Sequence, residues 1–367
     1  MSLSEMKKVL KKNNFLFNTH MLLSDKSYLL NFFDYFRHKH EKPGKTVWNE
    51  VRQFCKYWKS EPFTYFKYRM FEKNLTSDEM LDYIPAYFFY NVYIPSIYLN
   101  KNVYDIGGSK IKQSEFFHSR NIPAPREIAT IINGVPYSRK VKITFKDLLK
   151  EINESNCRSI FMKPDLGKGG KGILRLEKKQ DGYYLKNEIV DENLLSSVSN
   201  KKSFLLQEGV IQRKDFSTIY DKSVNTVRFV TQNLNNKVEI IAAVFRTGQN
   251  GNFVDNVSSG GLDMMINVQT GALDPYASDN DFKPFRTHPD TGFRYEGYII
   301  PGWDKIVGDI ISYCRKAPDY PHIAWDTAVT DEGLKVLEFN INYGFDGIQN
   351  CIGGLRRKID LTPAFQH

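Results

Sequence analysis

Several patterns that would assign the chain to a large class of proteins are missing from its sequence. No run of 18 aliphatic residues is present, which excludes a hydrophobic helix long enough to span a bilayer. No signal-peptide pattern opens the chain either, because a polar helix is predicted over residues 3–13. We therefore expect a cytoplasmic protein, with a peripheral position at the inner face of the membrane as the alternative.

Cysteine is scarce and scattered. None of the four cysteines stands in a CxxC or His/Cys spacing, so we expect reduced thiols and neither a zinc site nor a disulfide framework: Cys55, Cys157, Cys314 and Cys351. No Ser/His or Cys/His arrangement indicates a protein nucleophile. Zinc-finger, RNA-recognition and dense basic-stripe patterns are lacking too, so the net charge of +9 indicates an anionic partner without requiring nucleic acid. A nucleotide, a phosphorylated lipid or an acidic glycan would satisfy that charge.

What the chain does contain is a change of composition along its length. Its 367 residues, 41% of them hydrophobic, are enough for more than one domain. Nearly half of the aromatic residues fall within the first 100 positions, where further helices are predicted over residues 24–39, 45–59 and 77–90. From about residue 110 the pattern becomes mixed α/β. Residues 83–100 are uncharged and rich in tyrosine, which predicts burial against the mixed α/β part, with contact to a membrane surface as the alternative.

Two short runs around the turn Thr330–Leu334 form the most informative pattern. A hairpin loop of about three residues would place Asp326 opposite Glu338, and Asn340 would share the face of Glu338. Like charges so close destabilise a sheet, so we predict a Mg²⁺ ion between them, with a solvated polar face as the alternative. The opposite face is predicted to be core, formed by Trp325, Leu337 and Phe339.

The glycine-rich turn Gly167–Gly172 lies between two predicted strands. A dinucleotide fingerprint needs a helix after the turn, and a Walker A loop ends in Gly-Lys followed by Ser or Thr, so neither fits. The turn is typical of a flap whose backbone N–H groups close over phosphates. Lys163, on the strand that enters the flap, is predicted to point inward toward phosphate oxygens, with an outward, solvated lysine as the alternative.

A third pattern brings two arginines together. A hairpin around Asn235–Lys237 would place Arg228 opposite Val244, with Arg246 diagonally on the same face. Two guanidinium groups on one face repel each other unless an anion lies between them, and arginine suits phosphate or carboxylate. Downstream, Asn256–Gly261 supplies small polar groups that would allow a close approach to a triphosphate.

Taken in chain order, these residues resemble those of the ATP-grasp carboxylate–amine ligases. Lys110 resembles the first nucleotide-binding lysine, which precedes an Ile-Pro-x-Pro element. Lys163 resembles the second lysine, and the flap residues Gly169 and Gly170 resemble the phosphate loop. The series Arg…Arg…Asn…Gly-Gly of ribosomal-protein glutamate ligases is matched by Arg228, Arg246 and Asn256. The metal-binding Asp…Glu-x-Asn of the family is matched by Asp326, Glu338 and Asn340.

The hinge that binds adenine in this family is matched by Gln207, Glu208 and Val210. Gly209 stands where the family has a bulky hinge residue, and Asp215 is one candidate for the acid that binds ribose. The resemblance covers about residues 110–349. It is strongest with the sugar-transfer-associated ATP-grasp group of bacterial polysaccharide loci.

The resemblance implies an α+β protein with the ATP-grasp fold, in which two α/β lobes with mainly antiparallel sheets clamp ATP. An aromatic-rich helical N-terminal region would precede these lobes. The implied divisions are a helical region over residues 1–105, a lid lobe with the flap over 106–210, and a C-terminal lobe with the metal site over 211–367.

The implied reaction uses ATP and two Mg²⁺ ions, with Mn²⁺ as an accepted substitute. A small-molecule or glycan carboxylate, such as a uronic acid or an amino acid of capsule or O-antigen biosynthesis, would attack the γ-phosphate. An amine would then capture the acyl phosphate to give an amide, with Arg228, Arg246 and Lys163 neutralising charge. Two other classes remain open, namely an ATP-grasp kinase for a small molecule or glycan precursor and a non-catalytic nucleotide- or glycan-binding scaffold. The sequence predicts no oligomeric state.

Overall fold

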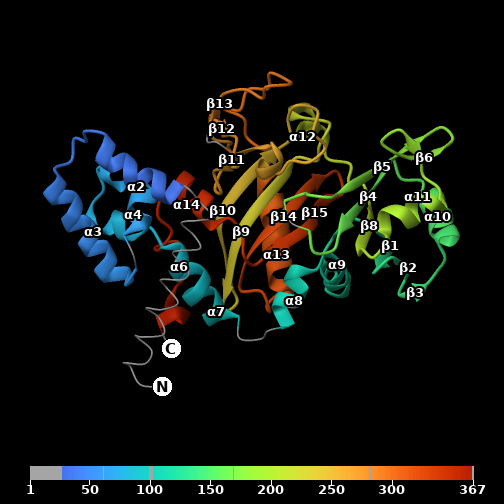
Figure 1. The fold of residues 1–367 in the computed structure, drawn as a ribbon, viewed down its shortest axis with the longest axis horizontal. Coiled ribbons are helices and arrows are strands. Elements are labelled where there is room, and N and C mark those ends of the chain that lie inside the picture. The colour runs from blue at the N-terminus through green and yellow to red at the C-terminus, as the bar shows by residue number, and fades with distance from the viewer. Residues whose placement is uncertain (1–26, 61, 99–101, 168, 281–282, 366–367) are drawn as a thin grey trace. The chain divides into compact units, whose positions relative to one another are not determined.

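The computed structural model describes residues 27–60, 62–98, 102–167, 169–280 and 283–365 (Figure 1). The chain divides into two compact units, which are a helical unit of residues 1–99 with 344–367 and an α/β unit of residues 100–343. Residues 344–367, predicted to belong to the C-terminal lobe, group instead with the helical unit. The helix predicted over residues 3–13 lies outside the described residues.

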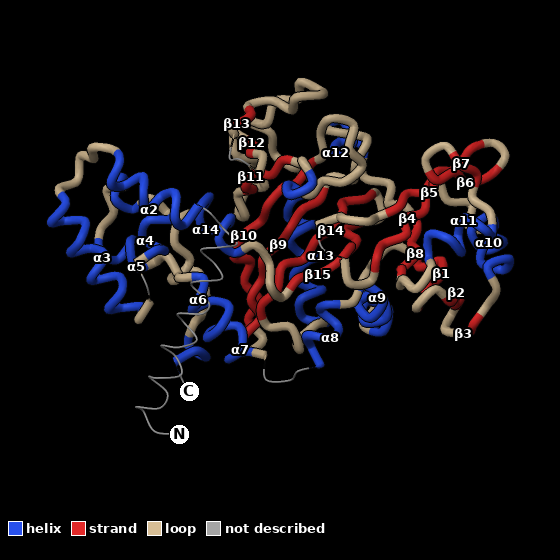
Figure 2. Tube along the Cα trace, in the orientation of Figure 1, coloured by secondary structure: helices blue, strands red, loops and turns tan. Residues whose placement is uncertain are grey.

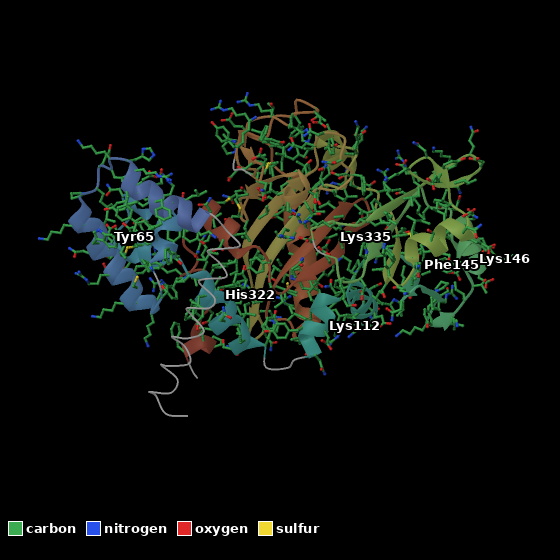
Figure 3. All side chains as sticks on the ribbon, viewed as in Figure 1. Tyr65, Lys112, Phe145, Lys146, His322 and Lys335 are labelled. Atoms are coloured by element: carbon green, nitrogen blue, oxygen red, sulfur yellow. The ribbon has the colours of Figure 1, made fainter. Side chains whose placement is uncertain are left out.

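Short helices with aromatic side chains build the helical unit. Tyr65, labelled in Figure 3, is fully buried, and its hydroxyl donates a hydrogen bond to Glu50. Helix α5 begins with a capping box formed by Thr76 and Glu79. The helical segments are α2 (Ser27–Arg37), α3 (Gly44–Trp58), α4 (Phe63–Lys67), η1 (Met70–Glu72), α5 (Ser77–Leu81), α6 (Ala86–Phe88), η2 (Phe89–Tyr93), α7 (Ile94–Ile97), α14 (Phe345–Ile352) and η4 (Thr362–Phe365).

The uncharged, tyrosine-rich segment is largely buried within residues 83–98. Phe89 stacks on Phe345 with ring centroids 3.9 Å apart, and the Gln349 side chain binds both the backbone N–H and the carbonyl of Ile84. The predicted burial of this segment therefore has partners inside the helical unit itself. Among the described residues, no helix combines the length and the apolar character needed to cross a bilayer.

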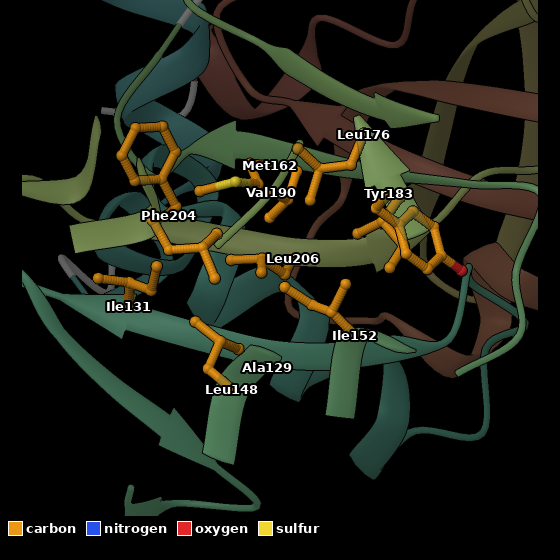
Figure 4. Close-up of a cluster of buried hydrophobic side chains, with 12 residues drawn as sticks. Ala129, Ile131, Leu148, Ile152, Met162, Leu176, Tyr183, Val190, Phe204 and Leu206 are labelled. Atoms are coloured by element: carbon orange, nitrogen blue, oxygen red, sulfur yellow. The ribbon is translucent and has the colours of Figure 1, made fainter. Parts of the chain in front are cut away.

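An eight-stranded antiparallel sheet forms the first half of the α/β unit, in the order β3-β2-β1-β8-β4-β5-β6-β7. Ile160 and Met162 on β4 point into a core that lies under α10 and α11 (Figure 4), whereas Phe161 and Lys163 point to the opposite face. The elements are α8 (Asn102–Gly108), α9 (Lys110–Ser119), β1 (Glu127–Ile132), β2 (Val135–Ser138), β3 (Val141–Lys142), α10 (Phe145–Glu154), β4 (Ser159–Pro164), β5 (Leu174–Lys179), β6 (Gly182–Leu185), β7 (Glu188–Ile189), α11 (Glu192–Ser199) and β8 (Phe204–Glu208).

A seven-stranded sheet forms the second half, in the order β13-β12-β11-β10-β9-β14-β15 (Figure 2). Helix α13 packs on this sheet, and every residue of β14, which lies between β9 and β15, is buried. His322, labelled in Figure 3, stacks on Tyr343, and burial lowers its pKa to about 3, so it is a neutral core residue. The elements are α12 (Lys214–Ile219), β9 (Thr226–Leu234), β10 (Lys237–Thr247), η3 (Val257–Ser259), β11 (Leu262–Ile266), β12 (Ala277–Ser278), β13 (Pro284–Phe285), α13 (Trp303–Lys316), β14 (His322–Thr330) and β15 (Gly333–Asn340).

The β14–β15 hairpin brings Asp326 opposite Glu338, as predicted, but by a different route. Its loop has two residues, because Thr330 pairs with Gly333. A β-bulge then leaves Leu337 as an extra residue on β15, and this bulge restores the predicted pairing. The prediction for Leu337 itself was wrong, since its side chain lies on the same side as Glu338 and not in the core.

The β9–β10 hairpin has the same combination of a two-residue loop and a β-bulge. Leu234 pairs with Lys237 around a two-residue loop, and both loop asparagines have positive φ angles, 52° and 62°, as a type I′ turn requires. A bulge at Ile241 shifts the register by one residue, so that Arg228 lies opposite Val244 as predicted. In both hairpins a shorter turn and a bulge give the same pairing as the predicted longer turn.

Candidate functional site

One cavity of the α/β unit lies between strands β4 and β8 of the eight-stranded sheet and one face of the seven-stranded sheet, the face that carries the charged residues. Its empty space, counting its open side, is about 890 Å³. Most of the predicted site residues line it, namely Lys110, Lys163, Gly169, Gly170, Glu208, Val210, Arg246, Asn256, Asp326 and Glu338. Three more are bonded to these lining residues without lining the cavity themselves: Gln207, Arg228 and Asn340.

Asp326 is the anion between the two arginines. Its carboxylate accepts two hydrogen bonds from Arg228, from Nε at 2.6 Å and from Nη2 at 2.7 Å, and Arg246 Nη1 lies 3.5 Å away. Arg228 and Asp326 are paired across β9 and β14, which fixes this geometry. Burial alone would raise the pKa of Asp326, but the attraction of the two guanidinium groups outweighs burial and holds it below its ordinary value.

Glu338 and Asn340 complete the predicted metal set. Glu338 lies opposite Asp326 and forms an ion pair with Lys110 at 3.5 Å. The Asn340 amide lies 3.4 Å from Asp326 Oδ2. The structure therefore brings two carboxylates and one amide together, with a lysine from α9 beside them. A cluster of three or more His, Cys, Asp or Glu residues suited to a metal is not found in the described part of the chain.

Lys163 points inward from β4. Its Nζ donates to Gln207 Oε1 at 2.9 Å, and the Gln207 amide nitrogen is in turn held by the Pro125 carbonyl at 3.3 Å. Burial lowers the pKa of Lys163 to about 8, with repulsion from Lys110 acting in the same direction and Glu338 acting against it. Gln207, predicted at the adenine hinge, is 2% exposed and here orients Lys163.

The glycine flap connects β4 to β5 and reaches the second half of the unit. Gly169 and Gly170 have φ angles of 63° and 73°, which favour glycine. The Gly169 carbonyl accepts a hydrogen bond from the Ser259 hydroxyl at 2.7 Å. A Cβ on Gly170 would lie 2.9 Å from Asn256 Oδ1, so the flap backbone passes directly over this asparagine.

The edge of the cavity at the end of β8 is built around a close backbone approach. A Cβ on Gly209 would lie 2.1 Å from Ser159 Oγ, and the Gly209 N–H donates to the Ser159 carbonyl at 2.8 Å. The bulky hinge residue of the family therefore has no room at this position. Glu208 lines the cavity next to it and pairs with Arg126 at 3.4 Å and Lys335 at 3.6 Å.

Asp215 is not brought into the cavity. Both of its carboxylate oxygens accept hydrogen bonds from Arg213, at 2.6 and 2.7 Å, and Tyr298 lies 3.4 Å away. Asp215 therefore forms an ion pair with Arg213 at the start of α12, and its predicted contact with ribose has no geometric support.

Sequence reasoning missed one acidic residue of the site. Asp255 lines the cavity and is 9% exposed, and its Oδ2 accepts a hydrogen bond from the Thr226 hydroxyl. Burial raises its pKa, with Arg246 and the Thr226 hydroxyl acting in the opposite direction. Its only signal in the sequence is its place directly before Asn256. The apolar lining at Phe161, Ile173 and Phe253 was missed as well.

Two antiparallel sheets with lysines on one side, acids and arginines on the other and a glycine flap between them define a protein of the ATP-grasp class. The family described as sugar-transfer associated ATP-grasp matches residues 90–359, and the chain belongs to this family. A comparison with curated proteins gives no match.

Solved structures with similar folds include several enzymes. N5-carboxyaminoimidazole ribonucleotide synthetase in its ADP complex is 10% identical, with a TM-score of 0.38 and coverage of 67% of this chain and 47% of its own. D-alanyl-alanine synthetase A from Vibrio cholerae is 11% identical, with a TM-score of 0.40 and coverage of 71% and 64%. The biotin carboxylase domain of Hydrogenobacter thermophilus 2-oxoglutarate carboxylase is 11% identical, with a TM-score of 0.41 and coverage of 72% and 47%. The chain thus spans about half the length of two of these structures.

Proposed function

We propose that the protein is an ATP-dependent carboxylate–amine ligase that forms an amide through an acyl phosphate. The observation that supports this most is one cavity that collects three lysines, an arginine and four carboxylates under a glycine flap. Cationic groups and backbone N–H donors suit a triphosphate, while the carboxylates suit the cation that accompanies it. The reaction needs no protein nucleophile.

The residues present fit Mg²⁺. Asp326 and Glu338 offer hard carboxylate oxygens, and the Asn340 amide would offer its oxygen after a half-turn, since amide O and N are not distinguished by shape. Mg²⁺ is commonly held by one or two carboxylates, with phosphate oxygens and water at its other positions. When bound, the ion supplies neutralisation of phosphate charge. The count of two ions and the cytoplasmic location stay predictions.

The residues of the chain have separable tasks in this proposal. Lys110 and Lys163 bind phosphate oxygens from the lid side, and the flap glycines donate backbone N–H groups. Arg246 binds the carboxylate substrate or the transferred phosphoryl group from the second sheet, where bidentate arginine suits both. Arg228 holds Asp326 in place and keeps it ionised. The apolar wall at Phe161 and Phe253 faces the base and excludes water.

For the substrate we propose a sugar carboxylate, such as a uronic acid, joined to an amine in polysaccharide assembly. The description of the family as sugar-transfer associated supports this choice. The net charge of +9 agrees with an acidic glycan or a nucleotide-linked sugar as the partner.

Trapping of the acyl phosphate tests the proposal without knowledge of the amine. The full chain is incubated with Mg-ATP, hydroxylamine and, one at a time, uronic acids in free and nucleotide-linked form. We expect one of them to give ADP and hydroxamate in equal amounts, and Glu338→Gln to give neither. ADP formed with a stable phosphorylated sugar and no hydroxamate would identify a kinase instead. No ADP release across the panel would favour a scaffold.

A further inference from the structure

Asp255 is the one acidic residue of the cavity wall whose charge has no basic partner within 4.0 Å among the described residues. Four acids line the cavity, and the other three are paired: Glu208 with Arg126 and Lys335, Asp326 with Arg228 and Arg246, and Glu338 with Lys110. A buried carboxylate without a cation is costly, so such a residue calls for a positively charged occupant or a proton.

The position of Asp255 is fixed by the loop between β10 and β11. A Cβ on Gly261 would lie 2.2 Å from the Asp255 carbonyl, so only glycine lets the chain return this closely. The Gly261 N–H donates to the Asn256 carbonyl at 3.0 Å. The carboxylate is anchored through Oδ2 by the Thr226 hydroxyl, and among the described residues no group donates a hydrogen bond to Oδ1. One oxygen is held and the other is left for a ligand in the cavity.

Asp255 lies near Arg246, the residue to which the proposed function assigns the carboxylate substrate or the phosphoryl group. Thr226, which anchors it, is paired across the strands with Arg246, and Arg246 lies beside Asp326. The charged groups that act on Asp255 are Arg246 on β10, Arg228 on β9 and Asp326 on β14, and neither a hydrogen bond nor an ion pair among the described residues joins Asp255 to Asp326. The next residue, Asn256, lies under the flap.

We propose that Asp255 binds the amine substrate and accepts its proton in the second half of the reaction. This inference rests on the proposed ligase function. The amine enters as an ammonium ion, which Asp255 attracts, and before attack one of its protons passes to Asp255 Oδ1 and from there to solvent. The nitrogen then forms a bond to the acyl carbon, the bond from that carbon to the phosphate oxygen breaks, and phosphate leaves with the electron pair. The second surplus proton of the nitrogen leaves to solvent.

A desolvated carboxylate suits this task, because a base whose pKa lies closer to neutrality accepts a proton more effectively from an amine. The burial that raises the pKa of Asp255 acts in that direction. The first half-reaction, attack of the carboxylate on ATP, transfers no proton from nitrogen and is independent of Asp255.

The test separates the two halves by choice of nucleophile. Hydroxylamine is uncharged at neutral pH, so no proton has to be removed before it attacks, whereas ammonium and the ammonium group of an amino acid must first lose a proton. With the carboxylate that gives hydroxamate, we expect Asp255→Asn to form hydroxamate within a few-fold of the wild type. Its rate of amide formation from ammonium or an amino acid should fall by about 10²–10⁴-fold, the usual contribution of a general base. Asp274→Asn is the matched control, because burial also raises the pKa of Asp274 but this residue does not line the cavity.

The outcomes are distinguishable. Equal loss of hydroxamate and amide in Asp255→Asn, with thermal unfolding unchanged, would place Asp255 in the first half-reaction and overturn the inference. Unchanged amide formation would overturn it as well. Hydroxamate from the wild type without amide from any amine probe would overturn the amine site while leaving carboxylate activation intact. Absence of hydroxamate from the wild type would refute the ligase function itself.

Discussion

The Arg228–Asp326 pair allows the sharpest test of the electrostatics of the site. The Asp326 side chain is 5% exposed, and Arg228 binds both of its oxygens at 2.6 and 2.7 Å. Arg228→Met keeps most of the apolar stem but leaves the buried carboxylate with only Arg246, 3.5 Å away. Removal of one partner of a buried pair costs about 3–5 kcal/mol. We expect the lower end, about 3 kcal/mol, because Arg246 remains.

Urea unfolding followed by tryptophan fluorescence measures this loss. Arg120→Met is the matched control, since Arg120 pairs with Asp319 at 2.7 Å on the surface, with side chains 41% and 53% exposed. An exposed pair of this kind contributes up to about 1 kcal/mol, so the control should change little. The double variant Arg228→Met with Asp326→Asn should regain stability relative to Arg228→Met, because the buried carboxylate is removed while Arg246 keeps the attraction of Asp255.

The dependence on pH gives an independent check. In the wild type the lowered pKa of Asp326 contributes stability above its unfolded value of about 3.9, and this contribution is lost as the pH falls through the folded value. In Arg228→Met, only Arg246 is left to offset burial, so the pKa of Asp326 rises. The difference in the free energy of unfolding between Arg228→Met and the wild type should therefore be largest at pH 7 and become smaller toward pH 4. A difference that does not change with pH, or a double variant as unstable as the single one, would refute this reasoning.

Three further predictions concern the nucleotide. Because burial lowers the pKa of Lys163 to about 8, binding of Mg-ATP should take up a proton above that pH, and log Kd should rise with pH toward a slope of one. Calorimetry should show this slope in the wild type and a flat profile in Lys163→Arg; a flat wild-type profile would contradict the assignment. Gly170→Ala places a Cβ 2.9 Å from Asn256 Oδ1 at a φ of 73°, so the KM for ATP should rise several-fold, with a loss of about 1 kcal/mol in stability. Steady-state kinetics with Gly251→Ala, where φ is 76° and nothing lies within 4 Å, controls for backbone strain alone. Glu338→Gln should abolish Mg²⁺-dependent ADP release while its thermal unfolding stays near that of the wild type, and retained turnover would remove Glu338 from the metal set.

The sequence predicted the pairing of charged residues better than the turns that produce it. Alternation along a strand and opposition across a hairpin place Asp326 against Glu338 whichever turn is used, provided that turn length and bulge add up to the same offset. A two-residue loop with a bulge is not distinguishable from a three-residue loop by pattern alone. The side chain on the bulge is where the two differ, and Leu337 was therefore assigned to the wrong face.

Residues whose roles depend on long-range contacts were harder to predict. Gln207 was matched to the hinge by its position in the chain, yet its partner Lys163 is on a neighbouring strand. Asp215 has an acidic side chain at a plausible place, but Arg213, two residues away, already binds it. Asp255 carried no motif, because its significance lies in its surroundings: a buried wall, an anchoring hydroxyl and, in the described parts of the chain, no basic group within 4.0 Å. None of these contacts can be predicted from the local sequence pattern.

The division of the chain into units has a practical consequence. Because residues 1–99 and 344–367 share one unit, the α/β unit is inserted in the sequence between the two segments of the helical unit. A fragment that begins at residue 100 and keeps the C-terminus would retain residues 344–367 without the rest of the helical unit. Phe345 would then lack its stacking partner Phe89, and the Gln349 amide would lack its hydrogen-bond partner Ile84. Such a tail would expose apolar side chains that are otherwise buried, among them Phe345 and Ile348, and would promote aggregation. For expression, the α/β unit should therefore be trimmed at both junctions, near residues 100 and 343, and the helical unit should be expressed with its two segments joined by a short linker.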